Sequence, residues 1–297
     1  MDQAEELRNI IKAKNQLNAK PAARVITVTS GKGGVGKSNT AINLAVQLKK
    51  EGKKVVILDA DFGLANIEIM FGAVPKYNLG DLVNKGKSIR EIITWGPMEV
   101  GFISGGSGIS GLANMDKNSL NYIIQNLTEL DEIADVIIID TGAGIADAVM
   151  EFLVASGEIL LVTTPEPTSI TDSYSVIKAL HMHPRFSKEE SKVRVITNRV
   201  EKEADGVGLF EKFNNVVEKY LDVPITYLGA VPQDGQLVQA VMQQMPISIQ
   251  NPKAKSAQAY ERIAAKLLDK EEGKTQERRG MAAFFSRIVS GRKMESR

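Results

Sequence analysis

The residues with the most specific chemistry lie at positions 31–38, where the sequence reads Gly-Lys-Gly-Gly-Val-Gly-Lys-Ser. A glycine-rich loop of this spacing lets successive backbone N–H groups surround phosphate oxygens at the start of a helix. Lys37 would neutralise charge on the terminal phosphate, and the hydroxyl of Ser38 is a suitable ligand for Mg²⁺. The pattern therefore predicts a site for ATP or ADP with Mg²⁺. The residues expected to contact the nucleotide here are Gly31, Lys32, Gly33, Gly34, Val35, Gly36, Lys37, Ser38 and Asn39.

Such a loop must lie between a strand and a helix, and the sequence supplies both. Residues 24–30 form an apolar strand pattern, and residues 41–48 have the pattern of a helix. Two further apolar runs end in carboxylates, Asp59 and Asp61 in one and Asp140 in the other. Because the carboxyl ends of parallel strands meet at one edge of a sheet, we expect these acids near the loop. Asp59 could instead cap the turn that follows it.

Strand and helix patterns alternate along most of the chain. The apolar runs are separated by helix-length stretches, which predicts an α/β fold with a mostly parallel central sheet and helices on both faces. Between positions 71 and 115 the pattern weakens, and the glycine-rich stretch 104–111 is expected to be a loop, either functional or a plain connector. The runs that predict strands are 24–30, 54–60, 136–140, 158–164, 192–197 and 225–231.

The second lysine of the loop, Lys32, is a departure from an ordinary P-loop. Alone it could be a solvated loop charge. The string Lys-Gly-Gly-Val-Gly-Lys-Ser at 32–38, however, resembles the deviant Walker A signature of the MinD/ParA superfamily of SIMIBI-class ATPases. The resemblance covers most of residues 24–268. It implies an ATP-dependent homodimer in which Lys32 reaches the phosphates bound by the other subunit, as an arginine finger does.

The same resemblance assigns roles to the carboxylates. It implies hydrolysis of ATP, with Lys32, Lys37 and Asp61 as the catalytic residues. Asp61 would lie near the attacking water and Mg²⁺, and Asp59 would help to hold the phosphate and Mg²⁺ region. Asp140 would bind Mg²⁺ through a water, and Gly142 would sense the γ-phosphate. The predicted Mg²⁺ residues are Ser38, Asp61 and Asp140.

Two later strand ends resemble the adenine site of the family. Asn198, followed by Arg199, occupies the position whose side-chain amide reads the base. Pro232 and Asp234 occupy the loop that closes over the adenine. An asparagine or a Pro-x-Asp at a strand end is also an ordinary turn signal, so that alternative stays open.

The C-terminal region divides into a polar linker, 269–280, and an amphipathic helix, 281–297. One helical face carries Met281, Phe284, Phe285, Ile288 and Val289, and basic residues flank it. Apolar burial combined with attraction to anionic lipids favours peripheral binding to an acidic membrane surface. One copy would bind weakly, so ATP-driven dimerisation could switch membrane binding on through avidity. The alternative is a terminal helix packed on the protein's own core.

The N-terminal region, 1–20, is predicted to be a short amphipathic helix ahead of the ATPase domain, 21–268. Its first residues, Asp2 to Arg8, resemble the activator motif of the FlhG/YlxH group of flagellar-number regulators within this family. That resemblance implies a contact with the signal-recognition-particle-type GTPase FlhF, and through it with flagellar basal-body assembly. Gln3, Leu7 and Arg8 are the residues expected to make the contact. A frayed surface helix is the alternative.

Composition excludes several other classes of function. The 37 basic and 36 acidic residues nearly cancel, so no nucleic-acid partner is expected from overall charge. The absence of cysteine excludes disulfides and cysteine-ligated iron–sulfur clusters. With no signal-peptide pattern and no run long enough to cross a membrane, we expect a cytoplasmic protein at the inner face of the cell membrane. A non-catalytic scaffold and a division-site or DNA-partitioning ATPase remain the alternatives.

Overall fold

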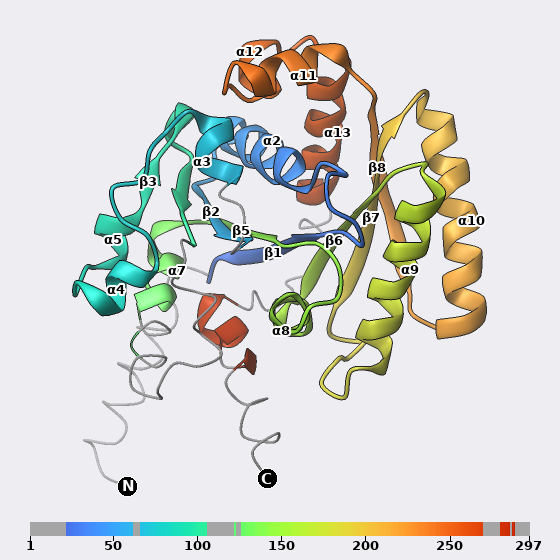
Figure 1. Cartoon of the computed structure of the whole chain (residues 1–297), viewed down its shortest axis with the longest axis horizontal. Coiled ribbons are helices and arrows are strands. Elements are labelled where there is room, and N and C mark those ends of the chain that lie inside the picture. The colour runs from blue at the N-terminus through green and yellow to red at the C-terminus, as the bar shows by residue number, and fades with distance from the viewer. Residues whose placement is uncertain are drawn as a thin grey trace, which may run out of the picture.

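The computed structural model describes residues 22–61, 66–105, 122, 126–269, 280–285 and 287–288, and its central feature is one sheet. The sheet has eight strands in the order β3-β4-β2-β5-β1-β6-β7-β8. Neighbouring strands are parallel, apart from the antiparallel pair β3–β4 (Figure 1). This confirms the predicted mostly parallel α/β fold. The strands are β1 (Arg24–Thr29), β2 (Val55–Ala60), β3 (Thr94–Trp95), β4 (Gly101–Ile103), β5 (Val136–Thr141), β6 (Glu158–Thr163), β7 (Lys192–Val200) and β8 (Ile225–Pro232).

Helices cover both faces of the sheet. One face is covered by α2 (Lys37–Lys50), α3 (Asn66–Phe71), α11 (Gly235–Met242), α12 (Ile247–Gln250) and α13 (Lys255–Asp269), whose buried residues form one core. The other face is covered by α4 (Gly80–Asn84), α5 (Ile89–Ile92), α7 (Leu130–Ile133), α8 (Asp147–Ala155), α9 (Pro167–Met182) and α10 (Glu203–Leu221). A 3-10 turn, η1 (Pro97–Glu99), joins β3 to β4.

The central strands contribute side chains to the cores on both faces of the sheet, because successive side chains of a strand point to opposite faces. In β5, Val136 and Ile138 pack on the α2 side, whereas Ile137 and Ile139 pack on the α7 and α8 side. All six residues of β5 are buried. A continuous apolar run is therefore the expected sequence of a strand that is covered on both faces.

The described C-terminal residues, 280–285 and 287–288, pack against the α7 and α8 side of the sheet. Met281, Phe284 and Phe285 are 0%, 2% and 3% exposed. The ring of Phe284 lies 5.9 Å from that of Phe152, and the backbone N–H of Met281 donates to Asp131 Oδ1 at 3.0 Å. The arrangement is therefore the alternative that the sequence left open, a terminal helix on the protein's own core, although the same apolar face was predicted to enter lipid. Val289 lies outside the described residues.

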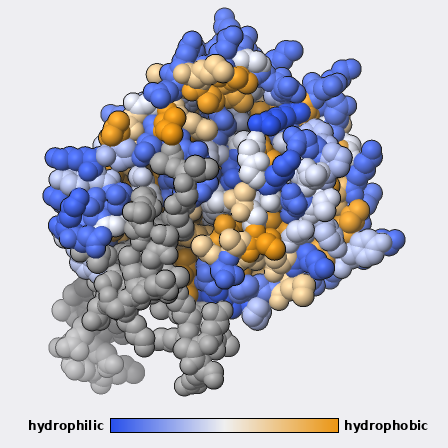
Figure 2. Space-filling view, viewed as in Figure 1, coloured by the Kyte–Doolittle hydropathy of each residue, from blue (hydrophilic) through white to orange (hydrophobic). Residues whose placement is uncertain are grey.

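Exposed apolar side chains occur on several elements of the described surface, including Val74, Ile145 and Met182. Figure 2 shows one such area over α11, where Val238 and Met242 are 55% and 78% exposed. Among the described residues, no helix is both long and apolar enough to cross a membrane.

Candidate nucleotide-binding site

The P-loop connects β1 to α2 at the carboxyl edge of the sheet, as the sequence predicts. Gly36 precedes α2 with φ of 97°, and Gly34 has φ of 76°, values that favour glycine. Lys37 and Ser38 are the first residues of α2, and they are 7% and 8% exposed. The first N–H groups of an α-helix have no partner within the helix and are available to a ligand. The loop is therefore a preformed anion site.

Gly31 is required by a neighbouring helix. A Cβ atom at this position would lie 2.1 Å from the carbonyl carbon of Asp172 in α9. The backbone of α9 thus rests directly against the start of the P-loop. No heavy atom lies within 4 Å of a Cβ built on Gly33, so the two glycines serve different purposes.

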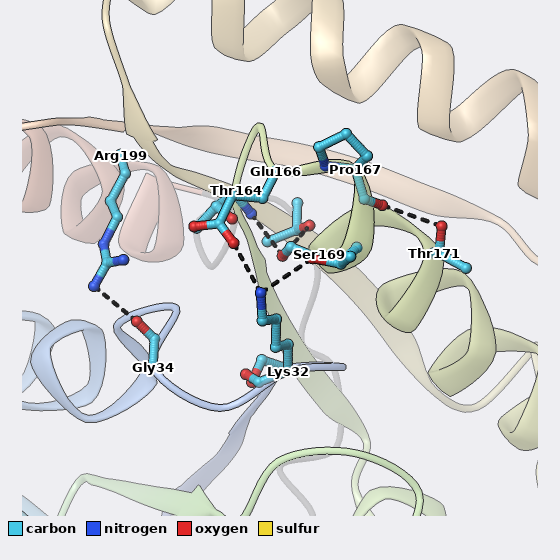
Figure 3. Close-up of polar contacts among 11 residues, drawn as sticks. Lys32, Gly34, Thr164, Glu166, Pro167, Ser169, Thr171 and Arg199 are labelled. Atoms are coloured by element: carbon cyan, nitrogen blue, oxygen red, sulfur yellow. Dashed lines mark hydrogen bonds and ion pairs between the residues drawn. The ribbon is translucent and has the colours of Figure 1, made fainter.

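Lys32 lies at the outer side of the loop, where its ammonium group has partners within the same chain. Its Nζ donates to Glu166 Oε2 at 2.9 Å and to Thr168 Oγ1 at 3.0 Å (Figure 3). The side chains of Lys32 and Glu166 are 40% and 52% exposed. Lys32 is therefore neither buried with Lys37 nor a freely solvated charge.

The predicted carboxylates do meet beside the loop. Asp59 and Asp140 are register partners on β2 and β5. Asp59 Oδ1 accepts a hydrogen bond from the N–H of Asp61 at 3.1 Å, and Oδ2 accepts one from Ile67 at 3.5 Å, so Asp59 caps the turn after β2. Asp61 Oδ1 lies 3.7 Å from where a Cβ on Gly142 would be. The ends of β2 and β5 therefore bring Asp61 and Gly142 together.

Asp140 is the most deeply buried acid of the site. It is fully buried, and within the described part of the chain neither carboxylate oxygen has a hydrogen-bond partner. Burial raises its pKa to about 7, while the nearby Ser38 hydroxyl and the Lys37 ammonium oppose that rise. Burial and the charge of Asp140 also raise the pKa of Asp59 to about 7. Such a site is electrostatically incomplete without a cation.

The donor set fits Mg²⁺. A buried carboxylate without partners and the Ser38 hydroxyl are oxygen ligands of the kind that Mg²⁺ prefers. The described residues contain no cluster of three or more acidic or histidine side chains that could hold a metal alone. Mg²⁺ commonly takes few protein ligands and completes its shell with phosphate oxygens and water.

Asn198 lies beside the P-loop, but its amide is already used there. Its Nδ2 donates to the Val35 carbonyl at 2.7 Å, and its Oδ1 accepts from the N–H of Arg199 at 2.9 Å. Arg199 has φ of 57° and donates from its guanidinium to the Gly34 carbonyl at 2.7 Å. The pair thus supports the P-loop backbone, and any contact with a base needs the second N–H of Asn198.

Asp234 has a similar structural use, at the start of α11. Its two oxygens accept from the N–H of Gln236 at 2.9 Å and from the hydroxyl of Ser256 at 2.8 Å. Partial burial raises its pKa, but hydrogen bonds from Ser256 and Gln236 outweigh that effect and hold the pKa below its usual value. Pro232 ends β8 next to this turn. These contacts are those of an ordinary turn at Pro232 and Asp234, which is the alternative that the sequence left open.

Sequence reasoning missed Glu166 and Thr168. They follow β6 in the run Thr163-Thr-Pro-Glu-Pro-Thr168, so they lie at the same edge as the acids after β2 and β5. The rule about strand ends that found those acids would also have found these two residues. The predicted partner-contact residues Gln3, Leu7 and Arg8 lie outside the described residues.

The sheet order, the P-loop between β1 and α2, and the acids at the ends of β2 and β5 define a P-loop nucleoside triphosphatase. Comparison with known families agrees: the ParA family, described as "NUBPL iron-transfer P-loop NTPase", matches residues 22–268. The chain belongs to this ParA/MinD family, whose members hydrolyse ATP, and it is an ATP hydrolase. It has no cysteine with which to hold an iron–sulfur cluster.

Three individual proteins are similar to this chain over most of its length. The chain is 35% identical to the antiactivator FleN of Pseudomonas aeruginosa over 85% of its own length and 89% of that protein. It is 32% identical to the flagellum site-determining protein YlxH of Helicobacter pylori, with 97% and 98% of the two chains covered. Its fold is similar to that of the MinD cell division protein of Aquifex aeolicus, with a TM-score of 0.66, 25% identity, and 83% and 97% coverage.

Proposed function

We propose that this chain is an ATP-dependent dimerisation switch that regulates the number and placement of flagella from the inner face of the cell membrane. The observation that carries the proposal is the position of Lys32. It lies at the exposed side of a P-loop whose own phosphate lysine, Lys37, is buried. The flagellar role rests on similarity to FleN and YlxH across most of the chain.

In this proposal the chemistry is hydrolysis of the β–γ bond of ATP. The P-loop amides and Lys37 hold the phosphates, and Asp61 orients the attacking water next to Gly142. Mg²⁺, bound by Ser38 and through water by Asp140, would neutralise charge on the phosphates. Lys32 of a second subunit completes the site by adding positive charge where negative charge develops. The P-loop amides hold the phosphates without moving first, because Gly34 and Gly36 already have their left-handed conformations.

The adenine base is proposed to bind at the same edge of the sheet. Asn198 and Arg199 support the loop from β7, and Pro232 and Asp234 shape the turn after β8. The base would lie between these two strand ends, with Asn198 offering the second N–H of its amide. Support of the loop and recognition of the base are compatible uses of one side chain.

Membrane binding requires the C-terminal helix to leave its position on the core. Met281, Phe284, Phe285 and Ile288, together with Val289, form the face proposed to enter acidic lipid, and the first four are covered by the protein in this structure. Docking would therefore keep a single subunit off the membrane. A dimer would present two released helices, whose combined affinity is far higher than that of one.

The output is proposed to be stimulation of the GTPase FlhF through residues 1–20, with Gln3, Leu7 and Arg8 in contact. Deleting residues 2–19 should abolish stimulation of FlhF and leave ATP hydrolysis intact. Unchanged stimulation would refute this part of the proposal.

The ATPase and membrane parts are tested together. Wild-type protein with a non-hydrolysable ATP analogue should float with vesicles that contain acidic lipid, whereas protein with ADP should not. Lys37→Ala should lose both ATP hydrolysis and flotation. A Lys37→Ala protein that hydrolysed ATP normally would sink the assignment of the site.

A division-site role is the second candidate, because the septum site-determining protein MinD of Helicobacter pylori is 31% identical over 90% of the chain. The two roles differ in the partner rather than in the ATPase. Stimulation of FlhF by the purified chain favours the flagellar role, and its absence with intact ATP-dependent dimerisation favours the division-site role.

A further inference from the structure

We propose that Glu166 is an intramolecular counter-ion that holds Lys32 within its own subunit and thereby sets the threshold for ATP-dependent dimerisation. The inference rests on the proposed function, in which Lys32 acts on the other subunit. Lys32 Nζ donates hydrogen bonds to Glu166 Oε2 at 2.9 Å and to Thr168 Oγ1 at 3.0 Å (Figure 3). Lys32 cannot keep both contacts and also reach across to phosphates in a partner.

The contact is held in place by the packing of α9. The close approach of Asp172 to Gly31 fixes the helix against the P-loop. At the start of the helix, the Ser169 hydroxyl accepts from the N–H of Thr164 at 3.0 Å, which secures the turn after β6. Pro167, the first residue of α9, restricts the backbone just after Glu166. These contacts therefore place the backbone that carries Glu166 and Thr168 next to Lys32.

The charge environment keeps Glu166 anionic. The hydrogen bond and charge of Lys32, with a smaller contribution from Arg199, hold the pKa of Glu166 below its usual value. Arg199 is itself tied to the Gly34 carbonyl. The Glu166 carboxylate thus lies between a cation that is fixed to the loop and a cation that is proposed to leave.

The Lys32–Glu166 ion pair is strong enough to shift the dimerisation equilibrium but too weak to prevent dimerisation. An exposed ion pair shifts an equilibrium by only about 1.5- to 5-fold. Phosphates of a bound nucleotide carry more charge than one carboxylate, so they can compete successfully for Lys32. A symmetric dimer breaks one such pair in each subunit, so the effect on the dimerisation constant is squared, to roughly 2- to 25-fold.

Glu166→Gln provides the test, because it removes the charge and keeps the shape of a side chain that is half exposed. Dimerisation with a non-hydrolysable ATP analogue and Mg²⁺ is measured by sedimentation over a range of protein concentrations. We expect the variant to dimerise at roughly 2- to 25-fold lower concentration than wild type. Glu211→Gln, an exposed glutamate on α10, is the matched control and should behave as wild type.

Two further measurements test whether Glu166 acts through Lys32 and whether it does so in a single subunit. Lys32→Ala combined with Glu166→Gln should behave as Lys32→Ala alone, since Glu166 acts only through Lys32. In nucleotide-free protein, acetylation of Lys32 followed by mass spectrometry should be faster in Glu166→Gln than in wild type. The acetylation result does not depend on dimerisation.

The outcomes are distinguishable. If wild type dimerises but Glu166→Gln does so equally or less well, Glu166 does not restrain Lys32 and this inference is wrong, while the proposed function stands. If wild type fails to dimerise with the analogue, the proposed function fails. Unchanged acetylation of Lys32 in the variant would then overturn the restraint in the single subunit as well.

Discussion

At the scale of single residues, the glycines of the P-loop are not equivalent. Gly31 makes room for the backbone of α9, whereas the space around Gly33 is open. Gly31→Ala should therefore lower the free energy of unfolding by about 1–3 kcal/mol through overpacking, measured by urea unfolding without nucleotide. Gly33→Ala is the matched control and should unfold as wild type. Equal stability of both variants would show that α9 does not press on Gly31.

The raised pKa of Asp140 makes its contribution to the stability of the protein depend on pH. Its pKa is about 7 in the folded protein and about 4 in an unfolded chain, so between these values the folded state binds more protons. The contribution of Asp140 to the stability of the nucleotide-free protein therefore falls as pH rises from about 4 to about 7 and is then constant. Asp140→Asn lacks this loss. Its stability relative to wild type should rise across that range by a few kcal/mol, since one pKa unit is about 1.4 kcal/mol.

The measurement for Asp140→Asn is urea unfolding at several pH values without Mg²⁺ or nucleotide. The same variant should lose ATP hydrolysis, because a neutral amide cannot replace the charge proposed to hold Mg²⁺ through water. Glu211→Gln on the surface of α10 provides the control. A stability difference that did not change with pH would contradict the burial of a costly charge at this position.

Local spacing explains why some site residues could be predicted and others could not. The P-loop and the acids after β2 and β5 follow from short strings and from the rule about strand ends. The use of Asn198 and Asp234 within the protein depends on Val35, Gln236 and Ser256, and the contacts with Val35 and Ser256 join residues far apart along the chain. A single sequence does not contain those distances.

At the scale of elements, the C-terminal helix is stabilised by the same residues that are proposed to enter lipid. Phe284→Ala should lower the free energy of unfolding by about 3 kcal/mol, at the low end for a buried phenylalanine, because a terminal segment can detach instead of leaving a cavity. It should also weaken flotation with acidic vesicles. Ala282→Ser, on the exposed side of the same turn, is the control for both measurements. Wild-type stability in Phe284→Ala would show that the docked helix adds nothing to the fold.

Long apolar runs made the six principal strands predictable, because each is covered on both faces or nearly so. The short strands β3 and β4, of 2 and 3 residues, lack enough length to show a pattern. They form because β4 pairs with β2 and because β3 folds back on β4. Their existence depends on the neighbouring strand more than on their own sequence.

At the scale of the whole molecule, the proposed function assigns the two P-loop lysines to the nucleotides of two different subunits. Lys37 is buried at the start of α2, whereas Lys32 is partly exposed and its ammonium group contacts Glu166. The docked C-terminal helix is on the other face of the sheet from α2. In the proposed function, a change at the carboxyl edge must therefore reach the opposite face of the sheet to release this helix.

In the proposed function, ATP joins two chains through Lys32. Size-exclusion chromatography with light scattering tests it directly, with wild type and Lys32→Ala, each with Mg²⁺ and either ADP or a non-hydrolysable ATP analogue. We predict about twice the single-chain mass of 32.3 kDa for wild type with the analogue, and the single-chain mass in the other three samples. One mass for wild type in both nucleotides, or a Lys32→Ala dimer as stable as that of wild type, would contradict the account.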